Sequence, residues 1–596
     1  AAVTGHRNIA IGPNASDALT TGLNNVALGQ NALGASTTGC ENIAIGTTAL
    51  GGADTTGNGN IAFGFNTGDA ITTGAGNIVM GGNAFGQATT GCFNLAIGEG
   101  TMNSVVTGCM NIAIGYSAAD ALTSGKHNIA FGQNALGAAT TGLRNTAVGK
   151  ETLIGLTTGC ENIAIGNAAG GPLVKSGSDD ACANIAIGLQ AADALTCGHT
   201  NIAIGSNALG AATIGVKNIA FGQSAMGGVT TGQADNNIAI GITAMQGGAS
   251  TSGDYNIAFG HSSLQNLEGG ANNIAMGTNA MDALTSGTCN IAMGENALGA
   301  STDGEDNIAI GRSALAASVN DGDKNVAIGL LAMGAGDVSG NDNVAIGTTA
   351  ADALTSGACN IAMGIDALGA ATIGVLNIAI GKGAMSAVTT EQSDGNIAIG
   401  EGALTGSSST AGDLNITIGK FSTYALTTGV CNVAIGRSAY GSATTGCHNI
   451  AIGGDALGGA ATTGSGNVAI GKNAADAIIG GAENVAIGTN ALGATSGGGY
   501  GIAVGYGAMS VGNAAGNYNA AFGVNALKSV TDGEANVGIG QNAGDALSTG
   551  ACNIAIGLNA YGSASGGGFN IAIGETAMGS TTVSGTDNIA IGQNTL

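Results

Sequence analysis

The sequence Asn-Ile-Ala-Ile-Gly, or a close variant of it, recurs from Asn8–Gly12 to Asn588–Gly592. Aligned on its asparagine, it occurs 34 times; of the 33 intervals, 22 are 17 residues long, six are 18, four are 19 and one is 22. A constant period of this size is typical of a solenoid, in which each unit stacks only on its neighbours. We therefore expect residues 1–596 to form one continuous array of rungs, with a small loop insertion near residues 170–181.

Each repeat carries the pattern of a short strand between two corners. Ile9 and Ile11 alternate with Ala10, which is the period of two expected of a strand. The glycine that follows is present in all 34 copies, which indicates a corner with positive φ or no room for Cβ. Thr21-Gly22 marks a second corner. The pattern predicts an all-β fold, a parallel β-solenoid of about 34 rungs with two short strands each, spaced about 4.8 Å apart in a rod of roughly 160 Å.

Two positions of the repeat are predicted to hold the rungs in register. The asparagine is missing from one copy, where Gly501 replaces it, and a repeated buried amide suits a stacked hydrogen-bonding ladder. The alternative is that each asparagine forms an ordinary Asx turn. The first members of this predicted structural ladder are Asn8, Asn25, Asn42 and Asn60, with Gly12, Gly29, Gly46 and Gly64.

The middle residue of the strand raises the question of assembly. It is Ala in every copy except Val79, Thr417 and Gly538, and it faces away from the two flanking apolar residues. If the Ile pair fills the core of the coil, the alanines form an apolar stripe outside, and such a stripe drives association. We therefore expect interchain contact through Ala10, Ala27 and Ala44 and their equivalents.

The segments Ala44–Ala49 and Ala203–Ala208 share an Ala-Ile-Gly-x-x-Ala unit. This unit resembles the head repeats of YadA-like trimeric autotransporter adhesins, and similar repeats occur in some phage tail-fibre proteins. The resemblance covers nearly the whole chain and implies a left-handed parallel β-roll assembled as a homotrimer on a cell or virion surface. The repeat here is longer than the adhesin repeat, and the chain shows no neck motif, heptad stalk or C-terminal anchor barrel.

Composition excludes several classes of protein. Apolar residues make up 44% of the chain and charged residues 8%, which does not fit a disordered chain. The net charge of −24 disfavours a nucleic-acid partner, and no apolar run is long enough to insert into a membrane. No Ser-His-Asp set, paired carboxylates, phosphate loop or metal-ligand cluster emerges, so we expect neither catalysis nor a cofactor.

Most of the eleven cysteines fall in the two positions before the asparagine. Cys92 and Cys109 occupy the same place on adjacent rungs, as do Cys160 and Cys182. The spacing between rungs lies within the range of Cα separations that a disulfide bridges, so these pairs predict disulfides within a chain or between chains in an oxidising compartment. The alternative is that each cysteine fills a small, half-buried turn position.

A variant of the repeat contains Asp-Ala-Leu or Asp-Ala-Ile. Its carboxylates recur every three to seven rungs, about 14 Å apart at the closest. They are therefore too far apart to share a proton or a metal, and we expect them to be solvated or paired between chains. They are Asp17, Asp69, Asp120, Asp193, Asp282, Asp352, Asp476 and Asp545.

We expect a non-enzymatic structural protein, the shaft of an extracellular adhesive fibre or filament, with self-association and a host-surface or matrix ligand. The alternative is the shaft of a phage or viral tail fibre. Recognition is expected in the variable corner pairs, such as Arg7, Glu41, Lys126, His127, Arg144, Glu161 and Lys217. A less favoured alternative is ice binding, because Thr precedes the corner glycine at Thr4, Thr21, Thr38, Thr56, Thr73, Thr90 and Thr107. Because terminal rungs expose unpaired strand edges, we also expect either capping domains or head-to-tail stacking.

Overall fold

The computed structural model describes residues 4–171, 181–212, 214–228, 234–247, 252–319, 322–387, 393–406, 412–494, 496–511, 516–579 and 583–596. It divides into two compact units, unit 1 (residues 1–304) and unit 2 (residues 305–596). Each unit is a parallel β-solenoid, as the repeat predicts. The described residues contain no helix, and so none that could cross a membrane. The predicted insertion near residues 170–181 falls mainly at residues 172–180, outside the described residues.

Each rung contributes one strand of three residues. The strands of unit 1 are β1 (Ile9–Ile11), β2 (Val26–Leu28), β3 (Ile43–Ile45), β4 (Ile61–Phe63), β5 (Ile78–Met80), β6 (Leu95–Ile97), β7 (Ile112–Ile114), β8 (Ile129–Phe131), β9 (Thr146–Val148), β10 (Ile163–Ile165), β11 (Ile185–Ile187), β12 (Ile202–Ile204), β13 (Ile219–Phe221), β14 (Ile238–Ile240), β15 (Ile257–Phe259), β16 (Ile274–Met276) and β17 (Ile291–Met293).

The strands of unit 2 are β18 (Ile308–Ile310), β19 (Val326–Ile328), β20 (Val344–Ile346), β21 (Ile361–Met363), β22 (Ile378–Ile380), β23 (Ile397–Ile399), β24 (Ile416–Ile418), β25 (Val433–Ile435), β26 (Ile450–Ile452), β27 (Val468–Ile470), β28 (Val485–Ile487), β29 (Ile502–Val504), β30 (Ala520–Phe522), β31 (Val537–Ile539), β32 (Ile554–Ile556), β33 (Ile571–Ile573) and β34 (Ile589–Ile591).

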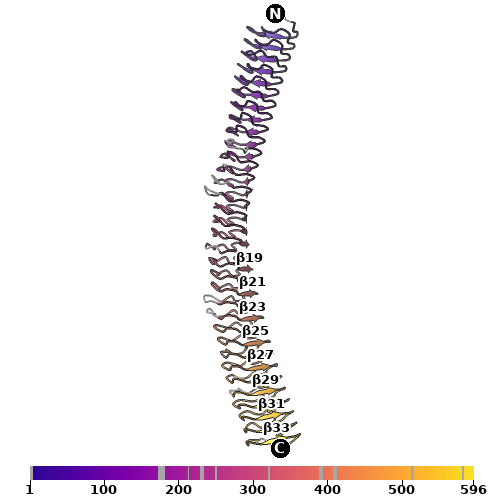
Figure 1. Ribbon diagram of the computed structural model, residues 1–596, viewed down its shortest axis with the longest axis vertical. Coiled ribbons are helices and arrows are strands. Elements are labelled where there is room, and N and C mark those ends of the chain that lie inside the picture. Colours follow the sequence, from indigo (N-terminus) through magenta and orange to yellow (C-terminus); the bar gives the residue numbers. More distant parts are fainter. Residues whose placement is uncertain are drawn as a thin grey trace. The chain divides into compact units, whose positions relative to one another are not determined.

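Within each unit, successive strands pair in parallel and in chain order (Figure 1). The register matches equivalent positions of the repeat: in β2 and β3, Ala27 lies opposite Ala44, with an apolar pair on either side. Insertions in the longer repeats leave this register unchanged, because the strands on either side of the 22-residue interval pair in the same way. The strand register is therefore independent of the length of the repeat.

The prediction of two strands in each rung is wrong for the described residues, which have one. The rest of the rung consists of turns that still hydrogen-bond to the next rung, as from Leu33 N to Ala49 O (3.0 Å). Residues with left-handed backbone interrupt the extended chain, for example Asn31 (φ 56°), Leu33 (φ 51°) and Glu41 (φ 60°). Leucine seldom adopts this conformation, so sequence propensity gives no warning of it.

The core is made of alanines and not of the isoleucine pairs, so the predicted assignment of strand faces is wrong. In β2 to β34 the middle residue is buried and both its neighbours are at least partly exposed; Ala27 and Ala44 are fully buried within their own chain. Ala27 and Ala44 therefore cannot be interchain contacts. Ala10 is exposed, but it lies in the terminal strand β1. Large buried residues from the turns share the interior with these small strand residues: at Gly538, in the alanine position, even an added Cβ would lie 2.8 Å from the Leu527 side chain of the preceding rung.

Candidate functional site

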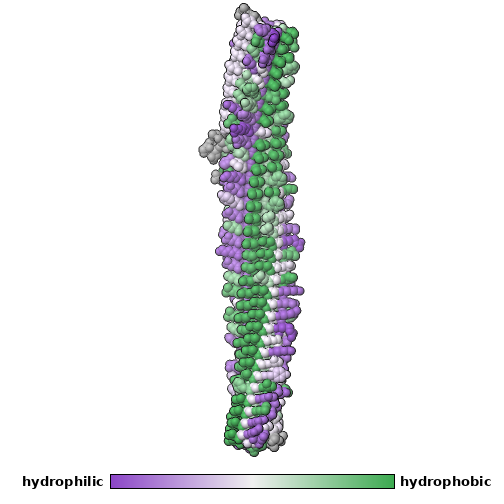
Figure 2. Space-filling view, turned by 90° about the vertical axis from the view of Figure 1, so that its right-hand side faces the viewer, coloured by the Kyte–Doolittle hydropathy of each residue, from purple (hydrophilic) through white to green (hydrophobic). Residues whose placement is uncertain are grey.

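The outward side of the strands is the most extended apolar feature of each unit. We call the first and third residues of every strand the apolar strand face. Of its 68 positions across the 34 strands, 67 carry Ile, Val, Leu, Met, Phe or Ala, and Thr146 is the exception. Single side chains are well exposed, such as Phe131 (52%) and Ile165 (40%). Figure 2 shows this face as a band of hydrophobic side chains running along each unit.

A buried amide ladder positions the strands that carry this face. Asn25 Nδ2 donates to Asn8 Oδ1 (3.1 Å) and to Gly39 O (2.8 Å), and the same Asn8 oxygen accepts the backbone N–H of Asn25 (2.9 Å). Asn42 N in turn donates to Asn25 Oδ1, and Asn60 Nδ2 to Asn42 Oδ1. Each asparagine therefore ties its own turn to the preceding rung, and fully satisfied buried groups of this kind specify one register.

The corner glycine after each strand ends the face sharply. Its φ lies between 126° and 143° in all copies, including Gly12, Gly29, Gly46 and Gly64, a region that other residues avoid. Neighbouring corners also approach closely: a Cβ added at Gly29 would lie 2.5 Å from Gly46 O. Both physical reasons for glycine at this corner therefore apply, positive φ and lack of space.

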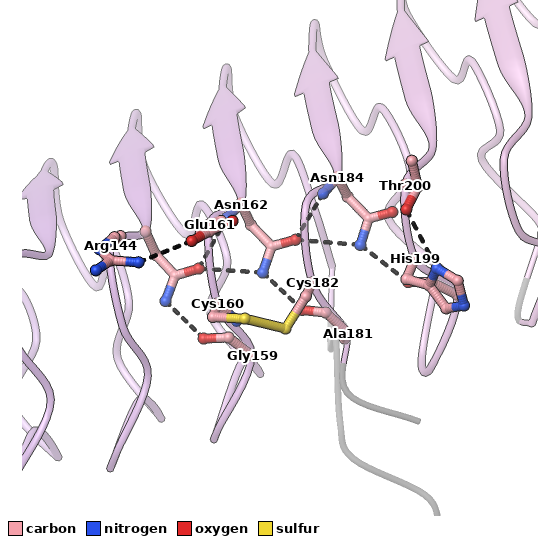
Figure 3. Close-up of a disulfide and its surroundings, with 12 residues drawn as sticks. Arg144, Gly159, Cys160, Glu161, Asn162, Ala181, Cys182, Asn184, His199 and Thr200 are labelled. Carbon is pink, nitrogen blue, oxygen red and sulfur yellow. Dashed lines mark hydrogen bonds and ion pairs between the residues drawn. A yellow bond between two sulfur atoms is a disulfide. The ribbon is translucent and has the colours of Figure 1, made fainter. Parts of the chain in front are cut away.

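One of the two predicted cysteine pairs is bonded. Cys160 and Cys182 form a disulfide between adjacent rungs, with a Cα–Cα distance of 4.6 Å, beside the amide ladder (Figure 3). Cys92 and Cys109 are free thiols, contrary to the second prediction. The Cys109 sulfur accepts the backbone N–H of Cys92 (3.3 Å), and the Cys92 thiol lies 3.4 Å from Thr90 O, so backbone groups satisfy both sulfurs.

The Asp variant of the repeat reflects packing. In these rungs a Leu or Ile lies two positions after Asp, and a small residue precedes Asp except at Asp282, which follows Met281. Most other rungs place the large residue first, so Ala119 and Leu122 alternate with Leu136 and Ala139, all buried. Burial raises the pKa of the carboxyl above its usual value in Asp69, Asp120, Asp193, Asp282, Asp352, Asp476 and Asp545. The structure does not bring these carboxylates together, and the part of the chain that it describes contains no group of three potential metal ligands.

The variable corner pairs lie beside the apolar strand face. Arg144 and Glu161, at equivalent positions of adjacent rungs, form an exposed ion pair (2.9 Å; Figure 3). Exposed ion pairs of this kind contribute about 0–1 kcal/mol to the free energy of unfolding, so they add little to the stability of the fold. Sequence reasoning missed a hollow in unit 2 at Gly383 and Gly402, on another side of the rung. The sequence does indicate this hollow: the second residue after the corner glycine is Gly in two successive rungs, whereas most rungs carry Asn, Ser or Thr there.

Comparison with known proteins adds no assignment to this geometry. No model of a known protein family matches the chain, and no curated protein matches it.

Proposed function

We propose that the protein is a non-enzymatic structural protein, the shaft of an extracellular adhesive fibre in which copies associate laterally through their apolar strand faces. The carrying observation is the composition of that face, apolar at 67 of 68 positions. Seventeen rungs per unit give a stripe about 80 Å long and about 7 Å wide, with a flat area of about 560 Å² before side-chain relief. Stripes of this size lie at the upper limit of what monomeric proteins expose.

A second copy of the same chain is the partner that fits. Within each unit the face repeats at the rung spacing, so its complement must be a surface with the same repeat, which another copy supplies. Each unit presents one such face, and faces of several copies that converge on a common axis bury it completely in a closed ring. We propose a homotrimer or a similar small bundle.

The same assembly would serve a phage or viral tail fibre, and the apolar strand face supports both uses equally. Ice binding ranks below them because three hydroxyls of the predicted threonine row are engaged within the chain. Thr4 Oγ1 donates to Thr20 O (3.4 Å), Thr56 Oγ1 to Thr72 O (3.3 Å) and Thr107 Oγ1 to Thr123 O (3.4 Å), so these three hydroxyls bond to the next rung.

Sedimentation of the full chain with a charged strand face tests the proposal. Ile129→Lys on β8 and Ile163→Lys with Ile165→Lys on β10 place three charges at exposed positions of the apolar strand face, so the rungs themselves remain packed. The matched control puts lysine at three exposed threonines outside the strand face, Thr73, Thr90 and Thr141. We expect wild type and control to sediment as the same oligomer and the face variant to dissociate, with unchanged far-ultraviolet circular dichroism. A wild-type monomer at micromolar concentration would refute the proposal.

A further inference from the structure

One place in unit 2 breaks the regularity of the turns. The second residue after the corner glycine forms a row along the rungs, and this row reads Asp366, Gly383, Gly402, Phe421. Two successive glycines occur at this position only here in the sequence, and Phe421 is its only aromatic residue. Between Asp366 and Phe421, three rungs or about 14 Å apart, lies a hollow of about 560 Å³.

We propose that this hollow binds an uncharged saccharide. A volume of this size is that of a small-molecule site. The surface of a pyranose alternates C–H faces with hydroxyl groups, and the hollow offers a partner for each. Phe421 and the nearby Tyr424 expose 39% and 44% of their surface for stacking against C–H faces. Asp352 and Asp366 supply acceptors for hydroxyl groups, and Lys382 supplies a donor.

The aromatic wall is held in place. The Phe421 ring lies over Gly402, because a Cβ added there would meet the ring carbons. Lys420 Nζ lies 5.3 Å from the centroid of the Phe421 ring and forms an ion pair with Glu401 Oε2 (2.9 Å). These contacts restrict the motion of the Phe421 ring before a ligand binds, which lowers the entropy cost of binding. A second hollow of about 380 Å³ shares Phe421 and Thr405 with the first and is also lined by Tyr424 and Ser438.

The charges around the hollow select the class of ligand. The carboxylates of Asp352, Asp366 and Glu401 repel a polyanion. The ammonium groups of Lys382 and Lys420 repel a polycation. Burial, and after it the neighbouring Asp366 carboxylate, raises the pKa of the Asp352 carboxyl. The two carboxyl groups supply hydrogen-bond acceptors for a partner that donates hydrogen bonds. Uncharged polyhydroxyl compounds meet both conditions. The lining residues lie outside the apolar strand face, so the site does not depend on the proposed lateral association.

Restoring the common residue of the repeat is the sharpest test. Gly383→Asn places the usual asparagine at a left-handed position (φ 63°), where its Cβ meets only Ser386 Oγ at 3.5 Å, and its side chain would fill the hollow. Gly100→Asn is the matched control, because Gly100 occupies the same repeat position in unit 1 with a similar φ of 67° and its Cβ would lie 3.4 Å from Ser117 Oγ. Phe421→Ala removes the aromatic wall instead.

Saturation-transfer NMR of the full chain would use neutral linear tri- and tetrasaccharides of glucose, galactose, mannose and N-acetylglucosamine as probes. We expect at least one probe to bind wild type and Gly100→Asn equally, and Gly383→Asn and Phe421→Ala to weaken binding by about tenfold or more. Circular dichroism confirms that each variant is folded. Absence of binding by every neutral probe, equal binding by Gly383→Asn, or binding only of a sulfated saccharide or an oligolysine would overturn the proposal.

Discussion

At the scale of single residues, the amino acid found at a position depends on the place of that position in the rung. The asparagine ladder shows this at its one defect. Gly501 N still donates to Asn484 Oδ1 (2.8 Å), but Gly501 has no side chain to accept the backbone N–H of the next ladder residue, Asn519. The ladder contacts made elsewhere are therefore lost on one side of this rung.

Gly501→Asn should stabilise unit 2. The new side chain restores one or two buried hydrogen bonds and removes the backbone freedom of glycine from the unfolded chain, together worth about 1–2 kcal/mol. Urea unfolding and hydrogen exchange around β28 to β30 would measure the gain. The reverse change, Asn536→Gly, should cost a similar amount. A neutral or destabilising Gly501→Asn would show that the ladder does not contribute to stability.

The half-buried carboxyls predict an unusual dependence on pH. Burial raises the pKa of Asp120, Asp193 and Asp282 above the unfolded value of 3.8, so the folded chain holds these protons more tightly. Their contribution to the free energy of unfolding is therefore fully present below pH about 3.8 and is lost as pH rises through the folded-state pKa values. Unfolding at pH 4.5 and 7.5 should show greater stability at the lower pH.

Asp120→Asn, Asp193→Asn and Asp282→Asn together should raise stability at pH 7.5 and flatten this profile. Replacing the exposed Asp306 by Asn removes the same kind of charge without the burial and serves as the control. Equal profiles for wild type and the triple variant would contradict the assignment.

At the scale of the rung, much of the fold follows from the sequence. The strand, its parallel register, the glycine corner and the rung count all follow from the repeat, because each depends on local pattern and spacing. Which side of the strand faces inward does not. A period of two places Ile43 and Ala44 on opposite sides, and hydrophobicity alone favours Ile inside. The buried Leu50 of the same rung occupies the interior of the coil, and the strand residue that faces inward with it is the small Ala44.

The disulfide links the two rungs that are separated by the longest repeat. Cys160 and Cys182 are 22 residues apart, and closing a loop of that length stabilises the chain by about 3 kcal/mol in the chain-entropy model. Cys160→Ser or reduction should therefore increase hydrogen exchange in β10 and β11 and leave β2 to β4 unchanged. Cys92→Ser, at an unbonded thiol, is the control. Uniform protection in the Cys160→Ser variant would show that the staple does not hold these rungs.

At the scale of the whole molecule, function depends on which surfaces are left over after folding. The amide ladder and the alanine core use the inward side chains, so the isoleucine pairs are left on the surface. The hollow at Gly383 could not be predicted from any one repeat, because it requires equivalent residues of four rungs to be read together.

Apolar association has a characteristic response to salt. The chain carries a net charge of −24, which opposes assembly at low ionic strength, while burial of the strand face is not screened. Raising sodium chloride or adding sulfate should therefore strengthen association measured by sedimentation. Dissociation at high salt would instead assign the contact to ion pairs at the edge, such as Arg144 with Glu161.

Cryo-electron microscopy of the purified chain tests the assembly most directly. We expect particles with several parallel chains in cross-section, in which the apolar strand face of each unit is buried against the other chains. Particles of one chain, or bundles in which the strand faces point to solvent while the turns make the contacts, would contradict it.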